Sequence, residues 1–224
     1  MAAALALALL ALYASLFPIL RRVTNRMRRQ MHEIEHQALH DALTGLPNRL
    51  LFADRVQQAL LAARREGGGV TVMLFDLDRF KEVNDTLGHQ SGDLLLQQLG
   101  PRLQTTLRSS DTVARLGGDE FAVLLPEVAG AESALAVARE LRQALEEPFA
   151  VDGLVLEVEA SIGIAVFPDH GSDGDTLLRR ADLAMYVAKE SHAGATLYDA
   201  VHDHYSPARL TLVAASGGRC NGAS

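Results

Sequence analysis

Residues 70–78 read Val-Thr-Val-Met-Leu-Phe-Asp-Leu-Asp, and this stretch decides the fold class. Its first six residues are apolar or β-branched without alternation, which is typical of a central strand covered on both faces. The predicted strand runs directly into Asp76 and Asp78, so it places carboxylates at the rim of a sheet. Side chains two residues apart on a strand face the same way, so both carboxylates share one side if the strand continues that far.

Two more acidic residues follow a predicted hairpin. Residues 112–116 and 121–125 have strand patterns and are joined by a short segment with two adjacent glycines. Asp119 and Glu120 come directly after these glycines. Because glycine leaves the backbone bare, a bulky anionic ligand can approach the tip of this hairpin closely.

The rest of the chain alternates between helical and strand patterns. Apolar residues at spacings of three and four indicate helices, and short apolar runs indicate strands. The predicted helices cover residues 49–65, 93–107, 131–145 and 176–189, and a further strand pair covers residues 154–158 and 162–167. Because both crossover and hairpin connections occur, the predicted class is α/β or α+β around a central, mostly antiparallel sheet.

The converging carboxylates predict a site for a hard cation. The single cysteine, Cys220, excludes a disulfide framework and a cysteine zinc cage. Mg²⁺ is typically held by one or two carboxylates together with phosphate oxygens in phosphoryl and nucleotidyl transfer. The alternative is that these acids only terminate strands and cap turns. For Asp78 both interpretations stay open, whereas for Asp76 and Asp119 we favour metal binding.

The composition excludes several classes of protein. The length of 224 residues suits one ordinary domain with an appendage. A charged fraction of 22% and an aromatic fraction of 5% exclude a disordered acidic tail and do not fit a strongly basic nucleic-acid binder. We therefore expect no nucleic-acid partner.

Residues 1–20 form a predicted transmembrane helix. From Ala2 to Leu20 the chain has no ionisable side chain except Tyr13, and at about 1.5 Å per residue this length crosses roughly the 30 Å hydrocarbon core. Arginines crowd residues 21–29, so the positive-inside rule predicts an inner-membrane protein whose chain after these arginines lies in the cytoplasm. A secretory signal peptide would carry its positive charge before the apolar stretch. A buried core helix is the alternative interpretation.

Residues 21–40 have the pattern of a juxtamembrane signalling helix. One stripe of this segment is apolar, with residues at spacings of three and four: Val23, Met27, Met31, Ile34 and Ala38. Such a helix can pair in parallel with a second copy and couple the membrane to the domain that follows. An amphipathic linker that lies on the membrane or on the domain is the alternative.

Residues 115–121 read Arg-Leu-Gly-Gly-Asp-Glu-Phe and reproduce the signature of GGDEF domains, the diguanylate cyclases. Further segments resemble motifs of this family in order along the chain: residues 41–49, 75–85, 88–93, 160–165 and 180–189. Residues 41–199 are thereby identified as a member of the family. The resemblance implies the palm-like α+β fold of adenylyl cyclases and polymerases, in which helices surround the central sheet.

The resemblance implies an enzyme that condenses two GTP molecules to cyclic di-GMP and releases two pyrophosphates. In each half-reaction a ribose 3′-hydroxyl attacks the α-phosphate of the other GTP. Asp76, the Leu77 carbonyl and Asp119 would hold Mg²⁺, with Mn²⁺ as an alternative ion. Asp119 matches the usual proton acceptor, and Glu120 shares metal or base duty in a way that the sequence does not divide. Because each site holds one GTP, the implied active form is a homodimer.

The resemblance also assigns residues that bind GTP. Asn84 and Asp93 correspond to the readers of the guanine edge, whose donors and acceptor suit an amide and a carboxylate. Lys81 and Lys189 correspond to cations that meet the phosphates. For His89, a structural hydrogen bond and a ligand contact both remain open.

An inhibitory site is predicted just before the hairpin. Residues 108–111 read Arg-Ser-Ser-Asp and match the RxxD product site of the family. Arg108 offers a bidentate fork to phosphate or guanine, and Asp111 accepts hydrogen bonds from guanine. The resemblance therefore implies feedback inhibition by cyclic di-GMP.

The sequence departs from the common family pattern after Lys189. Ala193 stands where many members have an arginine, and neutral His192 is a poor substitute for that cation. Residues 200–224 resemble the connector to an EAL domain and then become an irregular tail, and no EAL motif follows. The alternative function is a GTP-binding module, weak or inactive in catalysis, that regulates an EAL phosphodiesterase domain absent from this chain.

Overall fold

The computed structural model describes residues 37–201, together with residues 1, 17, 21, 24, 26 and 27. The chain divides into one unit of residues 1–40 and a second of residues 41–224. In the described part of the chain, no helix combines the length and apolar character that crossing a bilayer requires. Most of the predicted transmembrane helix, most of the predicted juxtamembrane helix and the tail after residue 201 lie outside the described residues.

The second unit alternates helices and strands. Its elements are α2 (Arg49–Glu66), β1 (Val70–Leu77), α3 (Phe80–Leu87), α4 (His89–Thr106), β2 (Thr112–Gly117), β3 (Glu120–Leu125), α5 (Ala131–Glu146), β4 (Phe149–Val151), β5 (Leu154–Leu156), β6 (Ala160–Phe167), α6 (Gly174–Ser191) and β7 (Ala195–Leu197).

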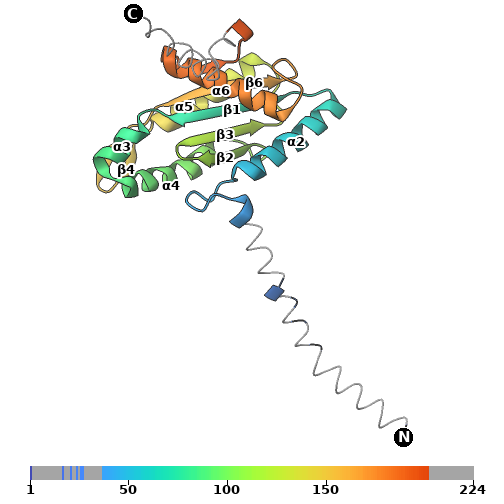
Figure 1. Ribbon diagram of the computed structural model, residues 1–224, viewed down its shortest axis with the longest axis horizontal. Coiled ribbons are helices and arrows are strands. Elements are labelled where there is room, and N and C mark those ends of the chain that lie inside the picture. Colours follow the sequence, from blue (N-terminus) through green and yellow to red (C-terminus); the bar gives the residue numbers. More distant parts are fainter. Residues whose placement is uncertain (2–16, 18–20, 22–23, 25, 28–36, 202–224) are drawn as a thin grey trace, which may run out of the picture. The chain divides into compact units, whose positions relative to one another are not determined.

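A five-stranded sheet forms the centre of this unit, in the order β2-β3-β1-β6-β7 (Figure 1). β1 pairs antiparallel with β3 and with β6, and β2 pairs antiparallel with β3. β7 runs parallel to β6, because α6 carries the chain back across the sheet between them. The expectation of a mostly antiparallel sheet is therefore corrected: the sheet is mixed.

Helices cover both faces of the sheet. Alternate side chains of β1, including Met73 and Phe75, pack with α4 and α5 in one apolar core. The intervening side chains, including Val72 and Leu74, pack with α2 and α6 in a second core. Burial on both faces explains why the sequence of β1 is apolar without alternation, as predicted.

Local sequence signals define the helix ends near the site. The Asn48 side chain caps α2 by accepting hydrogen bonds from the amides of Leu50 and Leu51, and Gly67 ends the helix at φ 71°. The Asp173 side chain caps α6 through the Thr176 amide. The two capped helices, α2 and α6, pack on the same face of the sheet. Because side chains alternate along β1, the side chain of Asp76 points toward this face.

The predicted pairing of residues 154–158 with residues 162–167 is wrong. β5 pairs instead with β4 in a separate two-stranded sheet, and β6 pairs with β1 and β7. Asp152 and Gly153 connect β4 to β5 with φ values of 50° and 79°. An Asp-Gly pair with two positive φ values favours a tight hairpin, and this local signal selects β4 as the partner.

Candidate metal and nucleotide site

Asp76 lies near the end of β1, opposite Glu120 of β3 and Ser161 of β6. Its side chain is 20% exposed, and Oδ2 accepts a hydrogen bond from the Nζ atom of Lys189 at 3.1 Å. Across the described part of the chain, Asp76 Oδ1 is the buried side-chain oxygen that has no hydrogen-bond partner. An acceptor of this kind, left unpaired by the protein, marks a position for a ligand.

The pKa of Asp76 is raised because its carboxyl group is buried and lies close to a second carboxylate. Burial and the neighbouring Asp119 carboxylate together raise the pKa of Asp76 to about 6, with burial as the larger cause and with Lys189 opposing both effects. The structure thus brings Asp76 and Asp119 together from β1 and from the β2–β3 turn. Carboxyl groups that resist ionising side by side are stabilised as anions when a cation lies between them.

These residues fit Mg²⁺. In the described part of the chain, no group of three or more His, Cys, Asp or Glu side chains is arranged to hold a metal ion. The predicted donor set contains two carboxylates that lie close together, Asp76 and Asp119, and the main-chain oxygen of Leu77 stays a predicted third donor. Oxygen donors with few protein ligands suit Mg²⁺, which keeps waters and phosphate oxygens in its remaining positions.

Asp78 has a structural contact. Its carboxylate accepts from the hydroxyl of Ser161 at 2.9 and 3.1 Å, and its amide donates to the carbonyl of Glu159. These bonds tie the end of β1 to the start of β6. Of the two interpretations left open by the sequence, the structure supports the strand-terminating one for Asp78.

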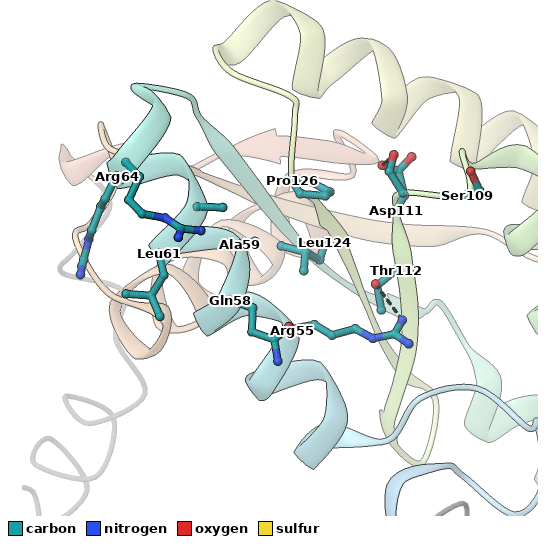
Figure 2. Close-up of a pocket in the computed structure, with 13 residues that line it drawn as sticks. Arg55, Gln58, Ala59, Leu61, Arg64, Ser109, Asp111, Thr112, Leu124 and Pro126 are labelled. Atoms are coloured by element: carbon teal, nitrogen blue, oxygen red, sulfur yellow. Dashed lines mark hydrogen bonds between the residues drawn. The ribbon is translucent and has the colours of Figure 1, made fainter.

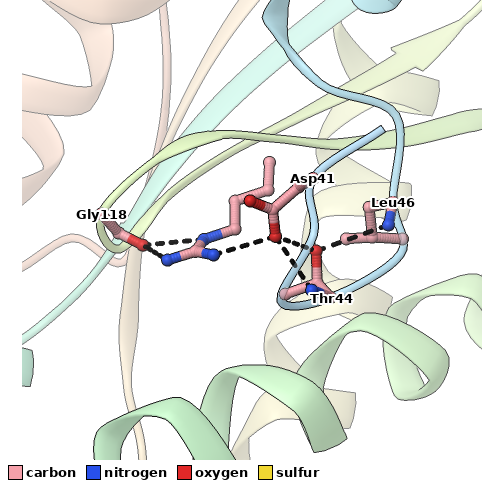
Figure 3. A network of polar contacts seen from close by, with 5 residues as sticks. Asp41, Thr44, Leu46 and Gly118 are labelled. Atoms are coloured by element: carbon pink, nitrogen blue, oxygen red, sulfur yellow. Dashed lines mark hydrogen bonds and ion pairs between the residues drawn. The ribbon is translucent and has the colours of Figure 1, made fainter. Parts of the chain in front are cut away.

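Arg115 anchors the glycine turn that precedes Asp119 by bonding to Gly118 and Asp41, which are labelled in Figure 3. Its Nε and Nη2 atoms donate to the carbonyl of Gly118 at 2.9 and 2.8 Å, and its Nη1 atom donates to Asp41 at 2.9 Å. The same Asp41 oxygen also accepts from the amide and hydroxyl of Thr44. Burial acts to raise the pKa of the Asp41 carboxyl, but the bonds from Thr44 and Arg115 outweigh it and the pKa is lowered.

The predicted guanine readers lie on adjacent helices. Asn84 belongs to α3, and Asp93 is exposed in the second turn of α4. A Cβ atom on Gly92 would lie 2.1 Å from the Asn84 side-chain oxygen, so glycine allows this close approach. The structure therefore brings Asn84 beside the residue that precedes Asp93. Lys81 in the first turn of α3 and His89 at the start of α4 are exposed.

The family model of the diguanylate cyclase GGDEF domain matches residues 38–195 of the chain. The chain belongs to this family. It is 44% identical to diguanylate cyclase TpbB of Pseudomonas aeruginosa over 155 residues, which cover 69% of this chain and 36% of TpbB. It is also 44% identical over 150 residues to the bifunctional diguanylate cyclase/cyclic di-GMP phosphodiesterase MucR of the same species, covering 67% of this chain and 22% of MucR. The chain thus spans about a third or less of the length of these relatives.

A solved GGDEF structure has the same fold. The coiled coil and GGDEF domain of DgcB from Caulobacter crescentus, determined in complex with c-di-GMP, superposes with a TM-score of 0.73 and is 27% identical. The match covers 83% of this chain and 98% of the DgcB chain. The palm-like α+β fold expected from the sequence is therefore confirmed, with the sheet corrected to mixed.

Glu120 of the GGDEF motif faces a different neighbour from Asp119. Its carboxylate pairs with Arg49 at the start of α2 at 3.5 Å, and both side chains are about half exposed or more. Glu120 and Arg49 line a cavity of about 370 Å³ that also contacts Asp182. Burial raises the pKa of Asp182. Asp119 and Glu120, whose roles the sequence does not divide, therefore have different neighbours: Asp119 lies close to Asp76, and Glu120 pairs with Arg49.

The RxxD segment of this GGDEF domain forms a turn before β2. The Asp111 side chain accepts from the Arg108 amide at 3.0 Å. Asp111 also lines a cavity of about 920 Å³ against α2 (Figure 2). Arg55, Arg64 and Arg65 of α2 line the same cavity, and the sequence reasoning missed them. From the sequence, these arginines could be assigned only to an amphipathic helix. That they lie near residues 109–112 depends on how α2 packs on the sheet, which their helical spacing does not indicate.

Proposed function

We propose that this protein is a diguanylate cyclase that condenses two GTP molecules to cyclic di-GMP with release of two pyrophosphates. The observation that carries the proposal is Asp76, whose buried oxygen has no protein partner and whose neighbours are Asp119 and Lys189. Family membership and the complex of DgcB with c-di-GMP support the same chemistry.

Each predicted site residue has a specific role in this reaction. Asp76, Asp119 and the Leu77 carbonyl would hold Mg²⁺, which supplies charge neutralisation at the phosphates and favours the alkoxide. Asn84 and Asp93 bind the guanine edge, and Lys81 and Lys189 contact the phosphates, with His89 beside the guanine readers at the start of α4. Asp119 and Glu120 are the candidates to accept the proton of the attacking 3′-hydroxyl.

Three further properties belong to the proposal. The active form is a homodimer, because one site holds one GTP and the reaction joins two. The chain is anchored to the inner membrane by residues 1–20, with the GGDEF domain in the cytoplasm. Cyclic di-GMP inhibits the enzyme at Arg108 and Asp111, which belong to one turn because the Asp111 carboxylate accepts from the main-chain amide of Arg108.

The test uses the full chain in mild detergent, incubated with GTP and Mg²⁺, with the products separated by chromatography. We expect cyclic di-GMP from the wild type and none from Asp119→Asn. Asp54→Asn, which alters an exposed carboxylate of α2, is the matched control and should keep full activity. A folded dimer that binds GTP and yields no product would overturn the assignment of diguanylate cyclase activity.

A second function has one observation in its favour. Ala193 lacks the cation that many family members carry, which favours a GTP-binding module that regulates an EAL phosphodiesterase domain. MucR, a similar protein, is described as bifunctional for synthesis and hydrolysis of cyclic di-GMP. GTP binding without turnover in the experiment above would select this function.

A further inference from the structure

A cavity of about 220 Å³ lies beside the proposed metal site. Lys189, which bonds Asp76, lines it together with Arg79, the residue before α3, and Arg142 from α5. Two acids, Asp78 and Glu159, also line the cavity. Cations therefore outnumber carboxylates on its walls, and Lys189 connects the cavity to Asp76. A ligand that carries several negative charges and reaches toward a metal ion suits this arrangement.

Arg142 reaches the cavity by lying against the backbone of Gly194. A Cβ atom on Gly194 would lie 2.2 Å from the Cζ atom of Arg142, so any larger residue at 194 would displace the guanidinium. Gly194 also has a φ of 74°, which favours glycine for a second reason. The backbone after α6 is thus shaped to receive an arginine from α5.

The guanidinium of Arg142 keeps donors for a ligand. Its Nη2 atom pairs with Glu146 one turn later on α5 at 3.3 Å, and the side chains of Arg142 and Glu146 are 33% and 55% exposed. An arginine has five N–H donors, so this single exposed pair leaves most of them available. Such exposed pairs are held weakly, and a phosphate can compete for the arginine.

The position of Arg142 coincides with the departure from the family pattern. Ala193, which stands where many members have an arginine, directly precedes Gly194. The Arg142 side chain therefore brings a positive charge from another helix to the neighbourhood of the residue that lacks one. α5 holds it rigidly, because Leu141 and Leu145 on either side of Arg142 are fully buried in the core.

We propose that Arg142 binds the terminal phosphates of the substrate together with Lys189, and so replaces from α5 the cation absent at Ala193. This inference rests on the proposed function, since it assigns a contact to GTP in the same site. According to this inference, Arg142 is a substrate-binding residue that contacts the triphosphate of GTP and not its guanine base.

The test compares ligands that differ only in their phosphates. 3′-deoxy-GTP lacks the attacking hydroxyl and GMP lacks the leaving group, so both can bind without reacting. With the full chain and Mg²⁺, we expect Arg142→Gln to weaken binding of 3′-deoxy-GTP about tenfold and to leave GMP binding unchanged. Arg139→Gln, one turn earlier on the exposed face of α5, is the matched control and should change neither affinity.

Rescue separates a phosphate contact from a structural effect. In the Arg142→Gln background, Ala193→Arg should restore most of the affinity for 3′-deoxy-GTP, because the charge returns from the adjacent backbone position. Thermal unfolding checks that each variant is folded, and the neutral Arg142→Met replaces Arg142→Gln if the latter is not. Equal affinities of wild type and Arg142 variants would overturn this inference while leaving the cyclase intact. A wild type that binds no GTP and forms no product would overturn both.

Discussion

Arg115 and Asp41 form an ion pair at 2.9 Å although they are 74 residues apart in the sequence. Their side chains are only 11% and 24% exposed. Arg115 also donates two hydrogen bonds to the carbonyl of Gly118, the residue before Asp119. The first residue of the second unit is therefore connected through one guanidinium to the turn that positions a proposed metal ligand.

Breaking this ion pair should affect both stability and activity. We expect Arg115→Leu to lower the free energy of unfolding by about 1–3 kcal/mol, because Asp41 and the Gly118 carbonyl lose a charged donor in a partly buried place. Synthesis of cyclic di-GMP should fall further than the folded fraction does, since Asp119 loses its support. Urea unfolding and product formation measure the two effects.

The acid dependence of the Asp41 pair has a defined sign. Because the folded-state pKa of Asp41 is lowered from 3.8, its stabilisation is present above that pH and is lost as the pH falls through the folded pKa. Asp41→Asn should therefore flatten this part of the acid-unfolding curve. The exposed variant Asp54→Asn should not, and an identical effect of both variants would contradict the assignment.

Asp76 should make the metal-free protein less stable as the pH rises. Its pKa is about 6 in the folded state against 3.8 as the ordinary value, so the folded state binds the proton more tightly. Stability is then highest below pH 4 as far as this group is concerned, falls between about pH 4 and pH 6, and stays low above. The loss should be about 1–3 kcal/mol.

Asp76→Asn tests this assignment directly. The variant should abolish that part of the pH dependence and raise stability at pH 7.5 in the presence of EDTA, while cyclic di-GMP synthesis is lost. Lys189 tolerates the change because its side chain is 49% exposed and can be hydrated. Urea unfolding at pH 4.5 and 7.5 gives the measurement, and an undiminished slope in the variant would refute the role of Asp76.

Gly163 on β6 allows α6 to approach the sheet. A Cβ atom there would lie 2.0 Å from the carbonyl oxygen of Ala181 and 2.1 Å from the amide nitrogen of Met185. Gly163→Ala must push the α6 backbone away, so we expect a loss of about 3 kcal/mol and a displaced Lys189. Gly68→Ala, where the nearest atom is 4.0 Å away, should cost little. Similar unfolding free energies for both variants would contradict this explanation.

Product inhibition should depend on the RxxD turn. We expect Arg108→Ala to reduce inhibition by cyclic di-GMP at least tenfold while the initial rate at low product stays unchanged, because the arginine supplies a charged fork to the product. Initial rates measured with added cyclic di-GMP provide the readout. Wild-type inhibition in the variant would show that the product acts elsewhere.

The sequence by itself determined the central strand and the two acidic positions at its end. β1 begins at the expected residue, continues two residues beyond the apolar run to Leu77, and has the expected double-sided burial. The hairpin of β2 and β3 lies where two strand patterns flank a glycine pair. These features depend on side-chain periodicity and on glycine, which act within a few residues and can be read locally. The helix over residues 80–87 was missed, since eight residues carry too short a periodic pattern.

The tertiary structure alone decided which distant groups meet. No spacing in the sequence indicates that Lys189 reaches Asp76, that Arg115 bonds Asp41, or that Arg142 lies against Gly194. Each of these contacts depends on how a helix or loop packs against the rest of the domain, which side-chain packing over the whole core determines. The chemistry of the individual residues was therefore readable from the chain, whereas their partners followed only from how its helices pack on the mixed sheet.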